Sequence, residues 1–330
     1  MIHGFRHSPG TYSRSVLWLF LIAALAAPAA AQPPGAAGAP PKSEAARQAG
    51  AFTCPMHPDM RSTTQGSCPV CGMALVSRDP AAGGGYDLEI KTSPAPVVAG
   101  RPFELQVTVR NPKTKTVVKE FTEVHEKRYH MFVISQDLEH YDHVHPEQRP
   151  DGSWSLELTV PKPGHYKIYS DFLPRGGTPQ VIARTLVTTG VAGEHAAGTR
   201  LTPDTELSHI ADSMSVTLQL PSGGLIAGRE QALTYRITDA ATGAPVTDIE
   251  PYLGAWGHSL LISEDTSHVV HAHPAEHIHE GANPKGGGPE LTFKAALPEP
   301  GTYRIWTQIK RRGEVSTAVF TVAAAPPAIR

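Results

Sequence analysis

Short segments in which apolar and polar residues alternate recur along the chain from about residue 86 onward. They are rich in β-branched and aromatic residues, and Pro, Gly or Asp interrupts the pattern every ~8 to 12 residues, as in strands. No segment keeps the 3.6-residue period of a capped amphipathic helix. The pattern predicts a mainly β protein with low helix content. The predicted strands are 103–110, 129–135, 154–161, 165–172, 232–238, 258–263, 291–297 and 302–309.

The predicted strands belong to two copies of one repeat. A shift of 128 positions places 130–146 on 258–274 without a gap, and further on a shift of 137 places 161–169 on 298–306. The second copy therefore carries a short insertion after the matched histidine segment. Short alternating strands with regularly spaced turns are typical of immunoglobulin-like β-sandwiches. We predict two tandem sandwiches, at residues 86–190 and 205–325.

The first residues are arranged like an export signal. Basic and polar residues precede an apolar run at 16–27, and small residues follow it. This order predicts a Sec-type signal peptide at 1–31 and a periplasmic or secreted protein. The run is too short for an ordinary membrane span, so we expect no stable membrane insertion after cleavage; an uncleaved anchor is the alternative. The Pro-, Ala- and Gly-rich residues 32–51 predict a disordered linker.

Charge and histidine content narrow the function. The formal net charge is -2, and no large basic cluster occurs, which argues against nucleic acid as a partner. Histidine is the unusual residue, because many of the 17 histidines fall in two windows, 125–145 and 258–279. Such clustering indicates a site.

All three cysteines lie in a predicted mini-domain at 52–80. Two residues separate Cys54 from His57, and two separate Cys68 from Cys71, the spacing of a knuckle-type metal site. A core this small normally needs a metal or a disulfide. A zinc-ribbon-like metal knuckle is therefore predicted.

The ligand types favour a copper- or zinc-type ion. Thiolate and imidazole suit Zn²⁺, whereas thiolates with nearby thioethers from Met56 and Met73 suit Cu⁺ or Ag⁺. A disulfide between Cys68 and Cys71 is the alternative. The segments CPMHP and GSCPVCGMAL resemble the heavy-metal-binding domain of bacterial efflux adaptors and copper-transporting ATPases. The resemblance implies metal binding by the two ligand pairs, with an efflux system or a metal-accepting protein as a partner.

The histidine windows predict a metal site in each sandwich. Alternate strand residues face one side, so His143 and His145 share a face. A hairpin that pairs residue 132 with 143, and His130 with His145, brings three imidazoles together, which suits Zn²⁺ or Cu²⁺ with an open position. A one-residue register slip would remove this site. The equivalent residues of the second copy are His258, His271 and His273, and possible extra ligands of the first are His125 and Asp171.

An alternative is that these histidines only cap the hairpins through backbone hydrogen bonds. The repeats also resemble secreted YtkA-like bacterial β-sandwich modules, in which a stretch like HMFVISQDL precedes HVHP. That resemblance implies fold more than activity. It leaves the role of the histidines open.

The sequence thus predicts an exported, non-catalytic heavy-metal-binding protein for sequestration, delivery or resistance. One alternative is a β-sandwich interaction module with purely structural metal. Another is a three-histidine metalloenzyme, which needs a general base. The candidates for that base, Asp142, Glu147 and Asp171, are not repeated in the second copy.

Overall fold

The computed structural model describes residues 52–53, 61–62, 76–77, 85–175, 177, 179–190, 200–274, 278 and 286–328. Every regular element in these ranges is a β-strand, in agreement with the predicted mainly β fold. The described residues contain no helix of the length and apolarity needed to cross a membrane.

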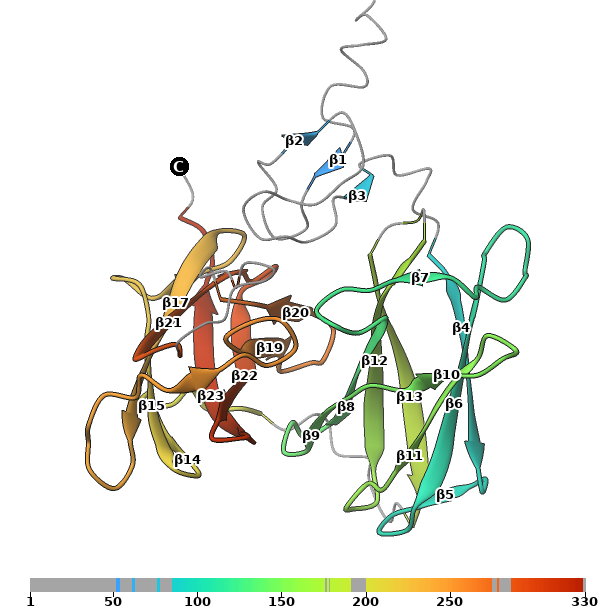
Figure 1. Cartoon of the computed structure of the whole chain (residues 1–330), viewed down its shortest axis with the longest axis horizontal. Coiled ribbons are helices and arrows are strands. Elements are labelled where there is room, and N and C mark those ends of the chain that lie inside the picture. The colour runs from blue at the N-terminus through green and yellow to red at the C-terminus, as the bar shows by residue number, and fades with distance from the viewer. Residues whose placement is uncertain are drawn as a thin grey trace, which may run out of the picture. The chain divides into compact units, whose positions relative to one another are not determined.

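Three short strands mark the predicted mini-domain. They form an antiparallel sheet in the order β2-β1-β3 (Figure 1). Their bounds are β1 (Phe52–Thr53), β2 (Arg61–Ser62) and β3 (Val76–Ser77). The predicted ligands of this segment lie outside the described residues, and they are Cys54, Met56, His57, Cys68, Cys71 and Met73.

The first sandwich is built from strands β4 to β13 in two sheets (Figure 1). One sheet has the order β10-β11-β6-β4, the other β5-β13-β12-β8-β9, and β7 pairs with β12. This order places β4, β6, β11 and β10 as strands A, B, E and D of the immunoglobulin fold, and β8, β12 and β13 as C, F and G. The bounds are β4 (Asp87–Ser93), β5 (Val97–Val98), β6 (Phe103–Arg110), β7 (Phe121–Thr122), β8 (Tyr129–Ser135), β9 (Tyr141–Val144), β10 (Glu147–Gln148), β11 (Trp154–Leu158), β12 (His165–Pro174) and β13 (Gln180–Thr189).

The second sandwich repeats this arrangement with a change at each edge of one sheet. Its sheets have the orders β14-β15-β17-β21 and β16-β23-β22-β19-β20, and β18 pairs with β22. Among the described residues it has no counterpart of β10, and β14 extends the sheet beside β15 instead. The bounds are β14 (Ser208–Ala211), β15 (Met214–Gln219), β16 (Leu225–Ile226), β17 (Glu230–Asp239), β18 (Ile249–Glu250), β19 (His258–Ser263), β20 (Val269–Ala272), β21 (Glu290–Ala296), β22 (Gly301–Arg311) and β23 (Glu314–Ala325).

Each sandwich has its own apolar core. Along β6, every second residue is buried, which is why FELQVTVR forms a strand with one face toward the core. Leu105, Val107 and Val109 are fully buried there, and Leu233, Tyr235 and Ile237 of β17 are their counterparts. Burying one such side chain stabilises the fold by roughly 1.5–3 kcal/mol.

A third apolar cluster joins the two sandwiches. All residues of β8 are buried, because Met131 and Val133 face the first core while Phe132 and Ile134 face the second sandwich. Tyr141 stacks on Trp306 with ring centroids 5.1 Å apart. The full set of buried residues in this junction cluster is Phe132, Ile134, Leu138, Tyr169, Leu201, Leu260, Ile262 and Trp306.

Candidate metal centre

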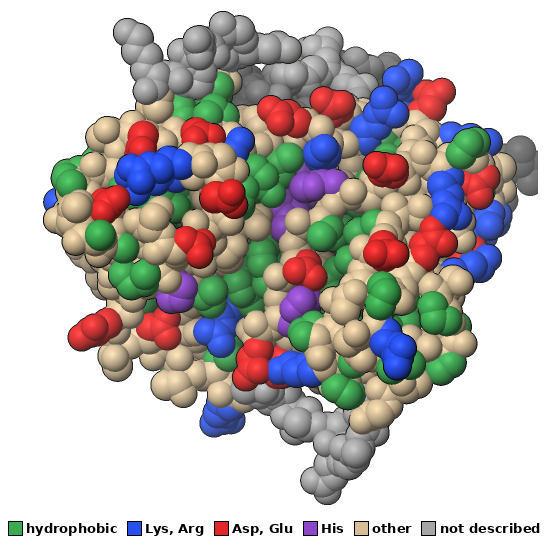
Figure 2. All heavy atoms as spheres, turned by 60° about the horizontal axis from the view of Figure 1, so that its bottom comes forward, with side chains coloured by type: hydrophobic (Ala, Val, Ile, Leu, Met, Phe, Trp, Pro, Cys, Tyr) green, Lys and Arg blue, Asp and Glu red, His purple; other side chains and the backbone are tan. Residues whose placement is uncertain are grey.

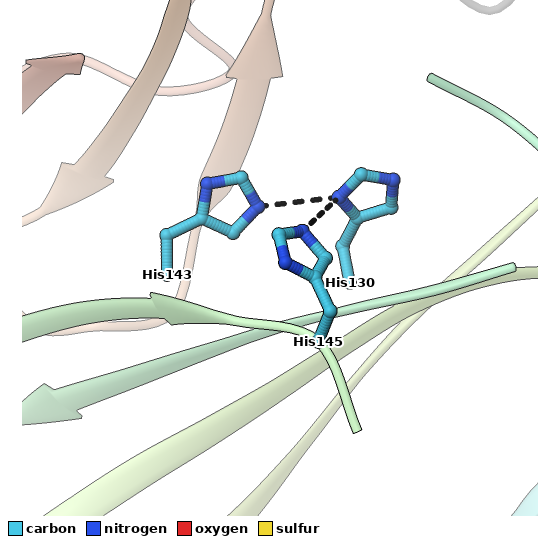
Figure 3. Close-up of side chains that lie close together, drawn as sticks. All are labelled: His130, His143 and His145. Carbon is cyan, nitrogen blue, oxygen red and sulfur yellow. Dashed lines mark hydrogen bonds between the residues drawn. The ribbon is translucent and has the colours of Figure 1, made fainter. Parts of the chain in front are cut away.

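The first histidine triad stands on the hairpin formed by β8 and β9 (Figure 3). The register pairs Phe132 with His143, as the sequence predicts, which brings His130 and His145 to the same end of the hairpin. Nδ1 of His130 lies 3.2 Å from Nε2 of His143 and 3.2 Å from Nε2 of His145. Three ring nitrogens therefore converge at one point.

The second triad has the same construction on β19 and β20. Leu260 pairs with His271, and Nδ1 of His258 lies 3.3 Å from Nε2 of His271. In each triad, the three candidate ligand atoms lie within 4.8 Å of one another. The ring centroids of His258 and His273 are 4.7 Å apart, at right angles. Both predicted sets of three histidines are thus brought together.

A backbone carbonyl orients the first histidine of each triad. Nε2 of His130 donates to the carbonyl oxygen of Val124 at 2.9 Å, and Nε2 of His258 donates to that of Tyr252 at 2.9 Å. These carbonyls precede two-residue turns with positive φ at both positions, 125–126 and 253–254. Because Nε2 carries the proton, Nδ1 of each ring is left as the inward ligand atom.

A side chain of the opposite sandwich orients the second histidine of each triad. Nδ1 of His271 donates to Oδ2 of Asp171, on β12 of the first sandwich, at 3.0 Å. Nδ1 of His143 donates to Oε1 of Gln308, on β22 of the second sandwich, at 2.8 Å. Neither contact was predicted from the sequence. The shift of 137 positions between the repeats aligns Asp171 with Gln308, so the sequence does indicate that the two residues occupy equivalent places.

Burial keeps these imidazoles neutral. It lowers the pKa of His143 and of His145 to about 2, and that of His271 to about 3. Burial is also the main cause that lowers the pKa of His130 and of His258. A neutral imidazole offers a lone pair, which is the form that binds a metal ion. Protons therefore compete weakly for these nitrogens at neutral pH.

In the second triad, two inner nitrogens face each other, and both are unprotonated when the rings are neutral and Asp171 is ionised. The carbonyl of Tyr252 and the carboxylate of Asp171 accept hydrogen bonds, so the proton of each neutral ring sits on its outer nitrogen. Nδ1 of His258 and Nε2 of His271 then direct lone pairs at each other across 3.3 Å. Such an approach is repulsive unless a cation lies between them. The first triad has the same arrangement while Gln308 accepts through Oε1.

The distances and an orphaned ring also fit a metal ion. Ligand nitrogens placed tetrahedrally around Zn²⁺ at 2.0–2.1 Å lie about 3.3 Å apart, close to the separations of 3.2 and 3.3 Å found here. Within the described ranges, both ring nitrogens of His273 are buried without a hydrogen-bond partner. Buried polar atoms are normally paired, and an ion at the triad would satisfy one of them.

The two possible extra ligands of the first site, His125 and Asp171, lie beside the second triad. His125 stacks on His273, with ring centroids 3.7 Å apart and an interplanar angle of 19°. Asp171 neighbours His130 across the sheet, but its carboxylate binds His271. The prediction assigned both to the first site because it treated each sandwich alone. Because the two sandwiches pack against each other, His125 and Asp171 contact the second triad instead.

A pocket of about 130 Å³ reaches this group of histidines from the first sandwich. Its lining includes His125, His130, Asp171, His271 and His273. Apolar residues and the basic side chains of Lys127 and Arg128 complete the lining. Figure 2 shows one face of the described residues, on which acidic and basic side chains are intermixed and histidine reaches the surface in few places. The pocket lining thus includes His130 of the first triad and His271 and His273 of the second.

Several solved structures are similar to this chain at low identity. An Escherichia coli adhesin, FdeC, is 13% identical with a TM-score of 0.24, over 78% of this chain and 68% of that chain. A two-domain fibronectin type-III segment of chicken tenascin is 13% identical with a TM-score of 0.20, over 73% of this chain and 100% of that chain. At such scores the fold rests on the strand order described above.

Three sequence matches identify the parts of the chain. Residues 51–77 match the heavy metal binding domain. A stretch of 26 residues is 69% identical to a silver exporting P-type ATPase of Salmonella typhimurium, a match that spans 8% of this chain and 3% of the ATPase. Residues 81–190 and 209–326 both match one further family model. The chain therefore belongs to the family described as Domain of unknown function (DUF8832), and it carries a heavy metal binding domain before its two sandwiches.

Proposed function

We propose that this protein is an exported, non-catalytic heavy-metal-binding protein that sequesters a copper- or zinc-type ion or passes it on. The observation that carries the proposal is the pair of facing inner nitrogens in the second triad, Nδ1 of His258 and Nε2 of His271, 3.3 Å apart, while the outer nitrogens of both rings contact the Tyr252 carbonyl and Asp171. Buried neutral imidazoles in this arrangement suit a borderline ion such as Cu²⁺ or Zn²⁺. The equivalent arrangement in the first triad supports a second ion.

The heavy metal binding domain supplies a softer site in this proposal. The ligands are Cys54, His57, Cys68 and Cys71, and the thioethers of Met56 and Met73 favour Cu⁺ or Ag⁺. Because the two kinds of site belong to one chain, the local concentration of one near the other is raised, which promotes transfer. An efflux system or another metal-accepting protein is the proposed partner, in the periplasm or outside the cell after removal of residues 1–31.

A second candidate function is a binding module in which the metal is purely structural. It is favoured by the position of the triads, because an ion held there would fix the histidines whose outer hydrogen bonds join the two sandwiches. The two functions differ in exchange. A structural ion exchanges slowly and its removal unfolds the protein, whereas a carried ion is taken up and released by the folded chain.

Elemental analysis of the purified protein tests the proposal. The full chain is compared with a Cys54→Ser/Cys68→Ser variant and a His143→Ala/His145→Ala variant after exposure to Cu²⁺ or Zn²⁺. We expect each variant to retain fewer ions per chain than the parent. If neither variant loses metal, the proposal is wrong.

A further inference from the structure

The outer hydrogen bonds of the two triads cross from one sandwich to the other. Asp171 of the first sandwich accepts from His271 at 3.0 Å, and Gln308 of the second accepts from His143 at 2.8 Å. Asp171 and Gln308 are repeat equivalents, as are His143 and His271. The two contacts are therefore related by the pseudo-symmetry of the repeat: each sandwich provides the hydrogen-bond acceptor for a histidine of the other. Neither contact can form in an isolated sandwich.

The two triads are also close together. The ring centroids of His130 and His271 are 5.8 Å apart, and those of His143 and His258 are 5.9 Å apart. Because each ion would lie about 3 Å from the imidazole centres that bind it, two ions would be within roughly 12 Å of each other. Phe132 of the junction cluster packs against both His143 and His271, with centroids 4.5 and 5.0 Å away.

We propose that the two triads form one coupled two-ion centre for borderline divalent cations, which is completed only when the sandwiches dock. In this centre Asp171 is a positioning residue for the second triad, and Gln308 is one for the first. The inference rests on the proposed function, and it adds that the sites are unequal and that each depends on the opposite sandwich.

The difference between Asp171 and Gln308 makes the second triad the tighter site. A carboxylate that accepts from the outer nitrogen of a histidine makes the inner nitrogen a stronger ligand and helps to neutralise the bound cation. An amide lacks that charge. Gln308 can also turn its NH₂ group toward His143, which would let the first triad form an ordinary histidine–histidine hydrogen bond without metal. The second triad should therefore fill first.

Site-resolved affinities of the full chain for Cu²⁺ test the assignment. Cys54→Ser/Cys68→Ser/Cys71→Ser removes the soft site, and His143→Ala/His145→Ala or His271→Ala/His273→Ala leaves a single triad. Adding Asp171→Asn should weaken the second triad by about 10- to 100-fold and change the first by much less. The matched control is Asp142→Asn, because Asp142 contacts His140 at 3.0 Å outside both triads. Equal loss at both triads, or no loss at the second, overturns the assignment.

The reciprocal variant keeps the test independent of any folding defect. Gln308→Glu adds the missing carboxylate, and we expect it to tighten the first triad by a similar factor. Loss of affinity there, or no change, contradicts the inference. The Cu²⁺ electron paramagnetic resonance spectrum of the second triad should also change with Asp171→Asn, which a purely structural effect on stability would not produce.

Spin–spin coupling tests whether the centre is shared. With two Cu²⁺ ions bound, we expect a dipolar-broadened spectrum that sharpens when either triad is removed. Two ions without measurable coupling overturn the inference but leave the proposed function intact. A protein whose triads bind no Cu²⁺ contradicts the proposed function itself.

Discussion

The two triads have the same kinds of inner ligands, three histidines each, and they differ in the residues that surround them. In both, a histidine of β8 or β19 donates to a backbone carbonyl at 2.9 Å, and the set is completed by one histidine in the next strand and one just beyond its end. The outer partner is Asp171 for the second triad and Gln308 for the first. His125 stacks on the second triad, whereas its repeat equivalent is Leu253. In the proposed centre, the inner ligands set which ion can be held, and the opposite sandwich sets how tightly.

Removing one triad should produce the largest effect on this comparison. In a background without the three cysteines, His271→Ala/His273→Ala should abolish binding of one ion per chain, because a single imidazole remains. Isothermal titration with Zn²⁺ measures the stoichiometry. His140→Ala and His268→Ala, at equivalent turn positions outside the triads, are the matched controls. An unchanged stoichiometry in the triad variant would contradict the assignment.

Weakening the junction cluster should affect both triads together. Trp306 is 2% exposed and stacks on Tyr141. Trp306→Ala should lower the free energy of unfolding by about 3–5 kcal/mol and weaken both sites, since the crossed hydrogen bonds need docked faces. Denaturant unfolding and Zn²⁺ titration measure the two effects. Trp154→Ala, in the first sandwich's own core, should lower stability and spare the sites of the folded chain.

Acid should destabilise the metal-free protein. Burial lowers the pKa of His143 to about 2 and of His271 to about 3, against about 6.5 in an unfolded chain. The unfolded state therefore binds more protons below pH 6.5, and the free energy of unfolding falls as the pH drops from about 6.5 toward 3. Each imidazole that stays neutral costs up to about 2 kcal/mol at pH 5. Burial raises the pKa of Asp171, which opposes this trend for one group only.

Urea unfolding midpoints between pH 8 and pH 5 measure this dependence. The His143→Asn/His271→Asn variant should show a shallower decline, because it has two fewer imidazoles to protonate. Midpoints that stay level for the metal-free parent would mean that the histidines are already protonated or solvated in the folded state.

Making the turns at 125–126 and 253–254 alike should produce the smallest effect. His125→Leu copies Leu253 of the second turn and removes the ring that stacks on His273 at 3.7 Å. We expect the affinity of the second triad to change by only a few-fold, because the three inner ligands and Asp171 remain. A loss as large as that of the triad variant would make His125 a ligand. Zn²⁺ titration of the variant distinguishes the two outcomes.

The sequence predicted the parts of this molecule well and their assembly poorly. Alternation predicted the strands around the triads, and the hairpin that pairs residue 132 with His143 is found as assumed from the sequence. Docking could not be predicted in this way, because nothing in the spacing says that the outer faces of β8 and β19 meet. A signal was available in HSLLIS of β19, where both faces carry large apolar residues, Leu260 and Ile262 on one and Leu261 on the other, which favours burial on both sides. The crossed roles of Asp171 and Gln308 depend on that contact.

The most direct test is zinc K-edge X-ray absorption of the full chain carrying Cys54→Ser, Cys68→Ser and Cys71→Ser, loaded with two equivalents of Zn²⁺. We predict a nitrogen shell at about 2.0–2.1 Å with imidazole scattering. The signal per chain should fall by about half in the His143→Ala/His145→Ala variant, as one of the two ions is lost. Zinc that is not retained, or an oxygen shell without imidazole scattering, would contradict a metal centre built from the two triads.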